Sequence, residues 1–332
     1  MALSQRVVTL ITLIRLFFLL ACLALSAQAP AQYPNKPIRL IVPAAPGGGT
    51  DIATRSLAPA LQHNLGQSVL IENRGGAGGV VGTEVVAKAA PDGYTLGMVY
   101  PSHATNVTLV TKTPYDPIRD FIPITLVAHE PTVLVTHPSV PANNLQEFIA
   151  WAKAQLAKGS LSYATDPGSA GFLAGELFKQ AADLKQIAYI PYKGSGPAAA
   201  DVVGGHVPFM WSVISIVTPY VKGGRLKALS IAAEKRAPGM PDVPTTAEGG
   251  LKDVIVSGWY VLVAPAKTPK EIIDRLHTET AKALKDPKVL ERLATSGSQP
   301  LGAGPDQAAT HIRSEIERWG RVLKAAGVQP TN

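Results

Sequence analysis

Glycine, serine and proline gather in three short segments, each placed after an apolar run and before a helical pattern. These segments are residues 46–51 (PGGGTD), 166–170 (DPGSA) and 193–197 (KGSGP), and residues 73–79 (NRGGAGG) form a similar fourth one. A helix N-terminus has unpaired N–H groups and about half a positive charge, so it can bind an anion. Glycines are also common in ordinary α/β turns, but several such turns facing one cleft predict an anion site that needs no Lys or Arg.

The familiar catalytic and cofactor motifs are absent from the sequence. The glycine segments lack the Lys of a phosphate-binding P-loop and the spacing of a dinucleotide fingerprint. The chain also contains no G-x-S-x-G, S-x-x-K or H-E-x-x-H motif, which argues against the common serine hydrolases and zinc peptidases. The seven histidines are dispersed and Cys22 is the single cysteine, so we predict no metal site and no cofactor.

The N-terminal segment, residues 1–31, has the composition of an export signal. A start containing Arg6 and Arg15 is followed by a ten-residue apolar run and by small residues (SAQAPAQ). This pattern predicts a secretory signal peptide cleaved after Ala31, because a membrane span needs about 20 residues. Cys22 faintly resembles a lipoprotein site, which stays a minor alternative. We therefore expect a periplasmic protein.

The charge of the chain gives no sign of a nucleic-acid partner. The formal net charge of +7 becomes +5 without Arg6 and Arg15, and the positive residues are scattered with no interleaved aromatic residues. Export also argues against ATP or NAD chemistry.

Two residues near the glycine segments are candidates for acid–base chemistry. His103 lies in a predicted loop (PSHATN), where a structural hydrogen bond is the simpler role. Asp51 follows the three glycines at the position of a helix cap, and capping is its default role. A periplasmic hydrolase or isomerase that uses one of them on a small acid is the alternative to a binding protein.

Short apolar strands alternate with helical patterns, which predicts an α/β fold with parallel sheets. Strands are predicted at 38–43, 68–73, 94–100, 132–137, 160–165, 188–192, 208–213, 227–233 and 256–265. Helices are predicted near 51–64, 80–90 and 144–157, after the segments at 166 and 193, and at 269–285 and 305–326, which close the chain. In the last helix Ile312, Ile316, Trp319, Val322 and Leu323 form one apolar stripe, which predicts a packing face.

A series of motifs runs in one order through the predicted mature chain. They are YPNKPIRLIVPAAPGGGTDIATRSLA, IENRGGAGGVVGTEVVAKAAPDGYTL, TPYDPIRDFIPI, PYKGSGPAAADVVGGHV, MPDVPTTAEGG, GWYVLVAPAKTP and ERWGRVLKAAGV. On these motifs the sequence resembles the Bug family, the periplasmic solute-binding receptors associated with tripartite tricarboxylate transporters. The resemblance implies a receptor and not an enzyme, without a cofactor. Its partners would be a small organic carboxylate and membrane transporter subunits or a sensor protein, and we expect a monomer.

The resemblance also implies an architecture. The family has an α/β, two-lobed type II periplasmic binding protein fold with the ligand cleft between the lobes and a two-strand hinge. Mapped onto this chain, lobe 1 is residues 32–130 plus 258–332 and lobe 2 is residues 131–257. The two crossovers of the hinge are expected near VAHEPTV and IVSGWY.

Carried over residue by residue, the resemblance places the ligand on the first glycine loop and on facing loops of both lobes. In lobe 1 the expected ligand-binding residues are Pro43, Ala44, Ala45, Pro46, Gly47, Gly48, Gly49, Thr50, Asp51, Ser102, His103 and Asn106. In lobe 2 they are Gly168, Ser169, Phe172, Tyr192, Gly194, Ser195, Trp211 and Ser212. The two serines Ser169 and Ser195 are also candidates for helix caps, and one hydroxyl can serve both purposes.

Three positions depart from the family's usual pattern. Ala44 stands where an aromatic residue is common, Phe172 where GSxxHL has histidine, and Ser212 at the usually acidic second position of DFMFD. An acid there would pair with a ligand ammonium more strongly than a serine can. We therefore predict a ligand without a positive amine and with an apolar or aromatic body near Phe172 and Trp211. The other interpretation, that these positions only support the fold, stays open.

Overall fold

The computed structural model describes Arg15 and residues 33–330, so the predicted signal peptide, apart from Arg15, lies outside the described residues. The strands and helices below lie in the unit Lys36–Asn332. The strands are β1 (Ile38–Val42), β2 (Val69–Asn73), β3 (Thr95–Val99), β4 (Phe121–Thr136), β5 (Ser162–Thr165), β6 (Ala188–Pro191), β7 (Phe209–Val213), β8 (Lys227–Ile231), β9 (Ser257–Pro265) and β10 (Gln299–Ala303). The helices are α2 (Gly49–Leu65), η1 (Ala77–Gly79), α3 (Val80–Ala87), α4 (Ser102–Leu109), α5 (Leu145–Lys158), α6 (Ala170–Ala181), α7 (Ser195–Val203), α8 (Ile214–Lys222), α9 (Lys270–Ala283), α10 (Pro287–Thr295) and α11 (Pro305–Ala325).

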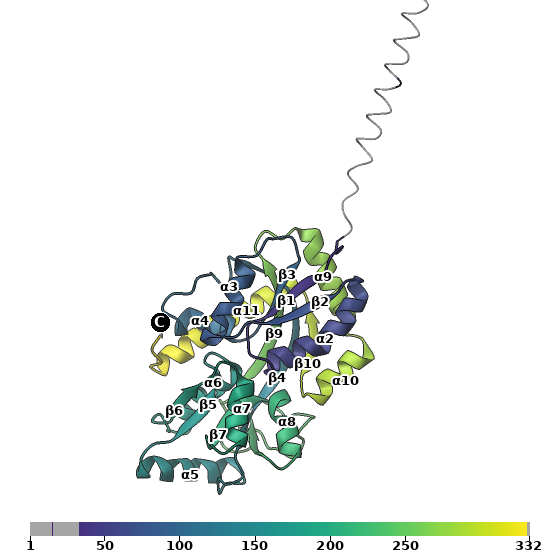
Figure 1. The fold of residues 1–332 in the computed structure, drawn as a ribbon. Helices are drawn as coiled ribbons and strands as arrows, with labels where there is room; N and C mark the ends of the chain where they lie inside the picture. Colours follow the sequence, from purple (N-terminus) through teal and green to yellow (C-terminus); the bar gives the residue numbers. More distant parts are fainter. Residues whose placement is uncertain (1–14, 16–32, 331–332) are drawn as a thin grey trace, which may run out of the picture. The chain divides into compact units, whose positions relative to one another are not determined.

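The first part of the chain builds a mixed sheet. Its strands lie in the order β10-β4-β9-β3-β1-β2, and Figure 1 shows β1, β2 and β3 among the helices α2, α3 and α9. Strand β1 runs parallel to β2 and β3, whereas β9 runs antiparallel to β3 and β4. Every residue of β3 is buried, as expected of a strand covered on both faces. The expectation of parallel sheets is therefore wrong for this sheet, because β9 and β10 run in the opposite direction to the other strands.

Strand β4 is long and takes part in two sheet regions. Its residues 121–131 pair with β9, and its residues 132–136 pair with β7 and β8. The sequence predicted a strand only at 132–137. The first half was missed because Pro123 and Pro131 interrupt it and its register shifts twice, which hides the period-2 pattern of a strand.

The middle of the chain forms the second region, drawn in teal and green in the lower half of Figure 1. Strands β5 and β6 form a small parallel sheet, and helix α6 packs on β7. A hydrophobic cluster that includes Phe148, Phe178, Phe209 and Trp211 fills this region. Another cluster, with Val99, Trp259 and Val261, lies under the mixed sheet.

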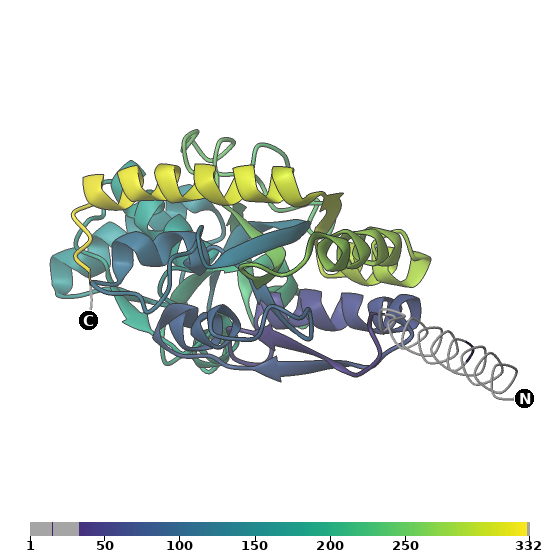
Figure 2. The same ribbon diagram turned by 90° about the horizontal axis from the view of Figure 1, so that it is seen from above.

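Helix α11 contributes to both clusters and crosses the view of Figure 2 as one long helix. Ile312 packs into the cluster under the mixed sheet, and Trp319 and Leu323 pack into the cluster of the second region. Between them the Glu315 carboxylate accepts hydrogen bonds from the indole N–H groups of Trp259 (2.8 Å) and Trp319 (2.9 Å). The apolar stripe predicted for this helix is thus a packing face.

Several elements were not predicted. Residues 102–109 form helix α4 and not a loop, and α8, α10 and β10 had no counterpart in the sequence reading. Pro219 breaks the apolar pattern of α8, and β10 is a partly exposed edge strand with a weak pattern. Two helices were expected to close the chain, but α10 and β10 lie between α9 and α11.

Within Arg15 and residues 33–330, no helix combines the length and the apolar character needed to cross a membrane.

Candidate ligand-binding site

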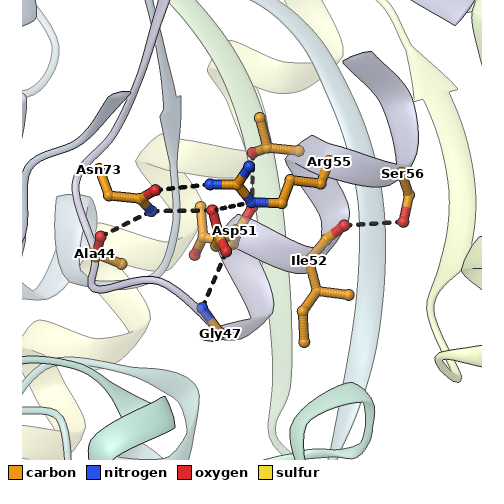
Figure 3. A network of polar contacts seen from close by, with 9 residues as sticks. Ala44, Gly47, Asp51, Ile52, Arg55, Ser56 and Asn73 are labelled. Carbon is orange, nitrogen blue, oxygen red and sulfur yellow. Dashed lines mark hydrogen bonds and ion pairs between the residues drawn. The ribbon is translucent and has the colours of Figure 1, made fainter. Parts of the chain in front are cut away.

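The first glycine loop is held in place by a polar network around Asp51, at the start of α2 (Figure 3). One carboxylate oxygen of Asp51 accepts the backbone N–H of Gly47 at 3.0 Å. The other oxygen accepts hydrogen bonds from Arg55 Nε at 2.9 Å and from Asn73 Nδ2 at 3.0 Å. Asn73 Nδ2 also donates to the carbonyl oxygen of Ala44 at 3.2 Å. Asp51 therefore holds one end of the loop directly and the other end through Asn73.

The electrostatics of Asp51 suit this structural role. Burial alone would raise its pKa, but the hydrogen bonds from Arg55, Gly47 and Asn73 outweigh burial, and the pKa is lowered. Asp51 is therefore a charged carboxylate whose two oxygens both accept hydrogen bonds, and it is not free to act as a general base. Asp51 lies in the first turn of α2, whose N-cap is Gly48, so it holds the loop before the helix and does not cap it.

A small cavity of about 30 Å³ lies beside this loop. It is lined by Ala44, Gly48, Gly49, Thr50, Tyr100, Pro101, Asp166, Ser169, Ala170, Gly171, Ser195, Val213, Gly258 and Tyr260. The first residues of α2, α6 and α7 are all in this lining. The cavity therefore meets the N-termini of three helices at once.

The caps of these helices leave N–H groups for a ligand. Neither Gly48 before α2 nor Gly194 before α7 provides a side-chain cap, because glycine has no side chain. At α6 the hydroxyl of Ser169 accepts the N–H of Phe172 at 3.2 Å, so the predicted cap at Ser169 is confirmed. Ser195 is the first residue of α7 and does not cap it. Free N–H groups of a first helical turn form a ready site for a carboxylate.

Tyr100 and Asp166 face each other on the cavity wall. The phenol O–H of Tyr100, which follows β3, donates to Oδ2 of Asp166, which follows β5, at 3.2 Å. Burial raises the pKa of Asp166 to about 7, and the hydrogen bond from Tyr100 opposes this rise only in part. Burial likewise raises the pKa of Tyr100 well above its ordinary value.

A second buried carboxyl group lies behind the cavity wall. Tyr260, on β9, lines the cavity and donates its phenol O–H to Glu130 Oε2 at 2.6 Å. The other oxygen of Glu130 accepts the backbone N–H of Ser215, near the start of α8. Burial raises the pKa of Glu130, although both hydrogen bonds act against the rise. Glu130 thus links β4, β9 and α8 beside the point where β4 changes its pairing partners.

Direct contacts cross the cavity region. The hydroxyl of Thr105, on α4, donates to the carbonyl oxygen of Gly168 at 3.1 Å. A Cβ atom added to Gly194 would lie 2.8 Å from the Cβ atom of Ala45. These loops are therefore in direct contact with one another.

The structure brings some of the predicted site residues into the cavity wall. These are Ala44, Gly48, Gly49, Thr50, Ser169 and Ser195. The remaining loop residues Pro43, Ala45, Pro46, Gly47, Asp51, Gly168 and Gly194 lie next to them but are not part of the lining. The glycine segments thus indicated which loops line the cavity, because main chain can lie close to a cavity only at residues with little or no side chain.

The polar residues expected around 102–106 have structural partners. His103 is buried in helix α4, where its Nε2 lies 2.9 Å from the carbonyl oxygen of Pro117. Its ring is parallel to that of Tyr115 and meets that of Phe121 edge to face. Burial lowers the pKa of His103 to about 4. Asn106 Nδ2 donates to the carbonyl oxygen of a glycine in η1 at 3.0 Å. Ser102 is buried near the same turn. The prediction that His103 lies in a loop is wrong, because residues 102–109 form helix α4, and its ring packs in an aromatic cluster.

The residues thought to shape the ligand body lie in the core. Phe172 and Trp211 are fully buried in the hydrophobic cluster of the second region and do not line the cavity. Ser212 is buried and donates to the carbonyl oxygen of Val213 at 3.2 Å. Tyr192 donates to Asp201 Oδ2 at 2.6 Å. Of the three positions that depart from the family's pattern, Phe172 and Ser212 are buried outside the lining, whereas Ala44 lines the cavity.

Sequence reasoning missed Tyr100, Asp166 and Tyr260 as cavity residues. Tyr100 and Asp166 directly follow strands β3 and β5, and ligands in α/β proteins lie beyond such strand ends. That position is a usable signal for these two. Tyr260 lies inside β9, and no local pattern distinguishes it from a core aromatic residue.

Comparison with known proteins agrees with this geometry. The family described as the tripartite tricarboxylate transporter family receptor, TctC, matches residues 53–328. The chain belongs to this family. Protein BugT of Bordetella pertussis is 39% identical to it over 323 residues, which are 96% of this chain and 98% of BugT. The predicted place among the Bug receptors is confirmed.

Several solved structures resemble this chain over most of its length. Periplasmic binding protein BugD has a TM-score of 0.86 and 34% identity, covering 90% of this chain and 100% of BugD. An R. palustris protein solved with adipate has a TM-score of 0.86 and 33% identity, with 90% and 100% coverage. MatC from Rhodopseudomonas palustris, with bound malate, has a TM-score of 0.83 and 33% identity, with 88% and 100% coverage. The predicted two-lobed type II periplasmic binding protein fold is thereby confirmed.

Proposed function

We propose that this protein is a periplasmic receptor that captures a small organic carboxylate between its two lobes and delivers it to a tripartite tricarboxylate-type membrane transporter or to a sensor protein. The observation that carries this function is the meeting of three helix N-termini, those of α2, α6 and α7, on one cavity. Their N–H groups and partial positive charges stabilise a carboxylate without Lys or Arg. The relatives solved with adipate and malate bind acids of this kind.

A receptor fits the site better than a hydrolase or isomerase does. The two acid–base candidates, Asp51 and His103, have structural partners, and neither lines the cavity. The family to which the chain belongs is a family of receptors.

The lobes of the proposal are residues 32–130 plus 258–332 and residues 131–257. The change of pairing partners on β4 after residue 131 supports the first boundary. The start of β9 at Ser257, and the hydrogen bond from Thr132 N to Val256 O at 3.2 Å, support the second. Residues 131–132 and 256–258 then form the hinge about which the lobes open and close.

The proposal assigns direct ligand contact to a subset of the predicted residues. These are Ala44, Gly48, Gly49, Thr50, Ser169 and Ser195, with Tyr100, Asp166 and Tyr260 added. The proposal also includes export by a signal peptide cleaved after Ala31 and action as a monomer. That BugD is a periplasmic binding protein supports the export.

Native mass spectrometry of protein purified without denaturation tests the function directly. We expect a retained small acid, and thermal stabilisation by malate, adipate or a related carboxylate. At a ligand concentration of 100 times Kd the free energy of unfolding should rise by about 2.7 kcal/mol. No retained acid and no stabilisation by any carboxylate of a broad panel would contradict the proposal.

The variant Gly49→Ala locates the binding in this cavity. Its added methyl group would collide with the Tyr260 hydroxyl and lie 2.7 Å from Val213 Cγ2. We expect carboxylate stabilisation to be lost while the fold persists. The control is Gly239→Ala, whose added methyl group would meet nothing closer than 3.8 Å and should leave binding unchanged.

A further inference from the structure

One carboxyl group lines a cavity that is otherwise built for anions. Among the described residues of the lining, none is Lys, Arg or His, and Asp166 alone carries a carboxyl group. Its side chain is buried, with the residue only 4% exposed. A negative charge at this place would repel the carboxylate that the helix N-termini attract.

Asp166 differs from the other buried acids near the cavity in how few donors it has. Tyr100 is its one hydrogen-bond donor among the described side chains, at 3.2 Å. Asp51 accepts hydrogen bonds from Gly47, Arg55 and Asn73, and Glu130 accepts them from Ser215 and Tyr260. Both oxygens of each of these carboxyl groups therefore have a hydrogen-bond donor. The second oxygen of Asp166 is left for whatever enters the cavity. Burial with a single donor favours the neutral acid, and the pKa near 7 agrees with this.

We propose that Asp166 determines which ligands the cavity accepts, because its protonated carboxyl group donates a hydrogen bond to a carboxylate oxygen of the bound ligand. This role rests on the proposed function. The proton comes from solvent, one for each ligand bound by a deprotonated receptor, and stays on Asp166 in the complex. A hydrogen bond from an acid O–H to a carboxylate is charge-assisted and strong. The cavity then prefers acids without an ammonium group, since a neutral acid gives an ammonium no counter-charge.

Other titratable groups lie on the elements around Asp166, and their effect on the pH dependence of binding has to be distinguished from that of Asp166. They are Tyr100 after β3, Asp51 on α2, His103 on α4, Glu130 on β4, Glu176 on α6, Lys193 before α7 and Tyr260 on β9. The phenols have a pKa well above the ordinary value and His103 has a pKa of about 4, so these groups keep one protonation state between pH 5.5 and 8.5.

The charged groups among them either form an ion pair with another residue or are exposed to solvent. Asp51 is paired with Arg55, and Glu176 with Lys179 at 2.9 Å. Lys193 is exposed. Glu130 is the remaining acid with a raised pKa, and it reaches the cavity only through Tyr260. A substitution at Glu130 therefore serves as the control for one at Asp166.

Isothermal titration calorimetry with malate and adipate, from pH 5.5 to 8.5, tests this role. The titrations are done in two buffers of different ionisation enthalpy, which counts protons taken up on binding. For the wild-type protein we expect the affinity to fall as the pH rises, by at most about tenfold per pH unit, with proton uptake on binding that approaches one at pH 8.5.

Three variants distinguish Asp166 from other causes of a pH dependence. Asp166→Asn keeps the shape and an N–H donor but cannot titrate, so its affinity should not change with pH and no proton should be taken up. Tyr100→Phe removes the donor that stabilises the charged form, so the midpoint of the pH profile should move upward. Glu130→Gln should keep the midpoint of the wild-type pH profile, whether or not its affinity for the ligand changes.

The outcomes separate this role from the function itself. Binding of malate or adipate with no pH dependence, or a pH profile that persists in Asp166→Asn, would overturn the role and leave the proposed function standing. Binding of aspartate or glutamate that is lost in Asp166→Asn, with no binding of plain dicarboxylates, would also overturn it, because Asp166 would then act as an anion for an ammonium. If no carboxylate bound the wild-type protein at any pH, the proposed function would fall as well.

Discussion

Asp51 stands directly after three glycines at the edge of a ligand cavity, a place where a carboxylate invites a catalytic interpretation. Its contacts give it another role. Gly47, Arg55 and Asn73 bind both of its oxygens, and Asn73 extends the network to Ala44, so one side chain holds the loop whose main chain faces the cavity. A buried and fully hydrogen-bonded acid fixes geometry and is poorly suited to accept a proton.

The substitution Asp51→Asn should therefore lower stability as well as binding. An amide keeps one acceptor and loses the ion pair, so we expect a loss of about 1–3 kcal/mol in the free energy of unfolding at pH 7. The folded-state pKa is lowered, so this contribution is present above the unfolded-state pKa of about 3.9 and is lost as the pH falls through the lower folded-state value.

Urea unfolding at pH 7 and at acidic pH measures this effect. The matched control is Asp274→Asn on α9, which breaks an exposed ion pair with Lys270 and should cost less than about 0.5 kcal/mol. Equal costs for the two variants at pH 7 would show that the Asp51 network does not stabilise the loop.

At the scale of elements, the position of the first glycine loop depends on how closely α3 approaches it. A Cβ atom at Gly82 would lie 2.5 Å from the carbonyl oxygen of Arg74 and 2.7 Å from Cα of Pro43. Both contacts are with main chain, which cannot swing away as a flexible side chain can. Helix α3 therefore sets the end of β1 and the start of the loop, and only glycine allows this distance.

Gly82→Ala and Gly320→Ala place the same methyl group in two different helices. In α3 it forces main chain apart, and we expect a loss of about 1–3 kcal/mol in stability with weaker ligand binding. In α11 the nearest atom would be 3.6 Å away, so the better helix propensity of alanine should raise stability by up to about 1 kcal/mol. Thermal unfolding of the two variants checks both signs. A destabilised Gly320→Ala, or an unaffected Gly82→Ala, would contradict the packing argument.

For the whole molecule, the proposed function implies an equilibrium between open and closed lobes. In this structure the hydroxyl of Thr105 donates to the carbonyl oxygen of Gly168, which belongs to the other proposed lobe. The Thr105 contact can form only when the proposed lobes meet, so we expect it to favour the ligand-binding form without touching the ligand. A ligand then needs to supply only the remaining free energy of closure.

Thr105→Val removes one closing contact while leaving the cavity wall intact, since Thr105 is not in the lining. Loss of one hydrogen bond worth about 1 kcal/mol should weaken ligand binding about fivefold. Thr108→Val on the same helix is the control, because Thr108 lies near Gly320 of α11 and not near the facing loop. Calorimetry with the same carboxylate compares the two. If both variants weakened binding equally, the contact with Gly168 would have no special part in closure.

Much of the fold could be predicted from local patterns in the sequence. Apart from the first half of β4, the predicted strands lie within a few residues of observed ones, as do most of the predicted helices. The glycine segments mark three helix N-termini at one cavity. Such features depend on residues close together in the chain, whose apolar period and lack of side chains appear directly in the sequence. The motifs that resemble the Bug receptors extended this local information to the family and the two-lobed fold.

Tertiary structure alone decided which polar groups share the cavity. Tyr100 and Asp166 are 66 residues apart, and Glu130 and Tyr260 are 130 apart, yet each pair shares a buried hydrogen bond. The same packing took His103 and Phe172 out of the expected site. No local pattern encodes these outcomes, because burial and the pKa of an acid depend on what surrounds it in space. The sequence by itself determined where glycine-rich main chain precedes helices; the folded arrangement decided that three of these helix N-termini and the buried Asp166 share one cavity, because only packing brings distant residues together.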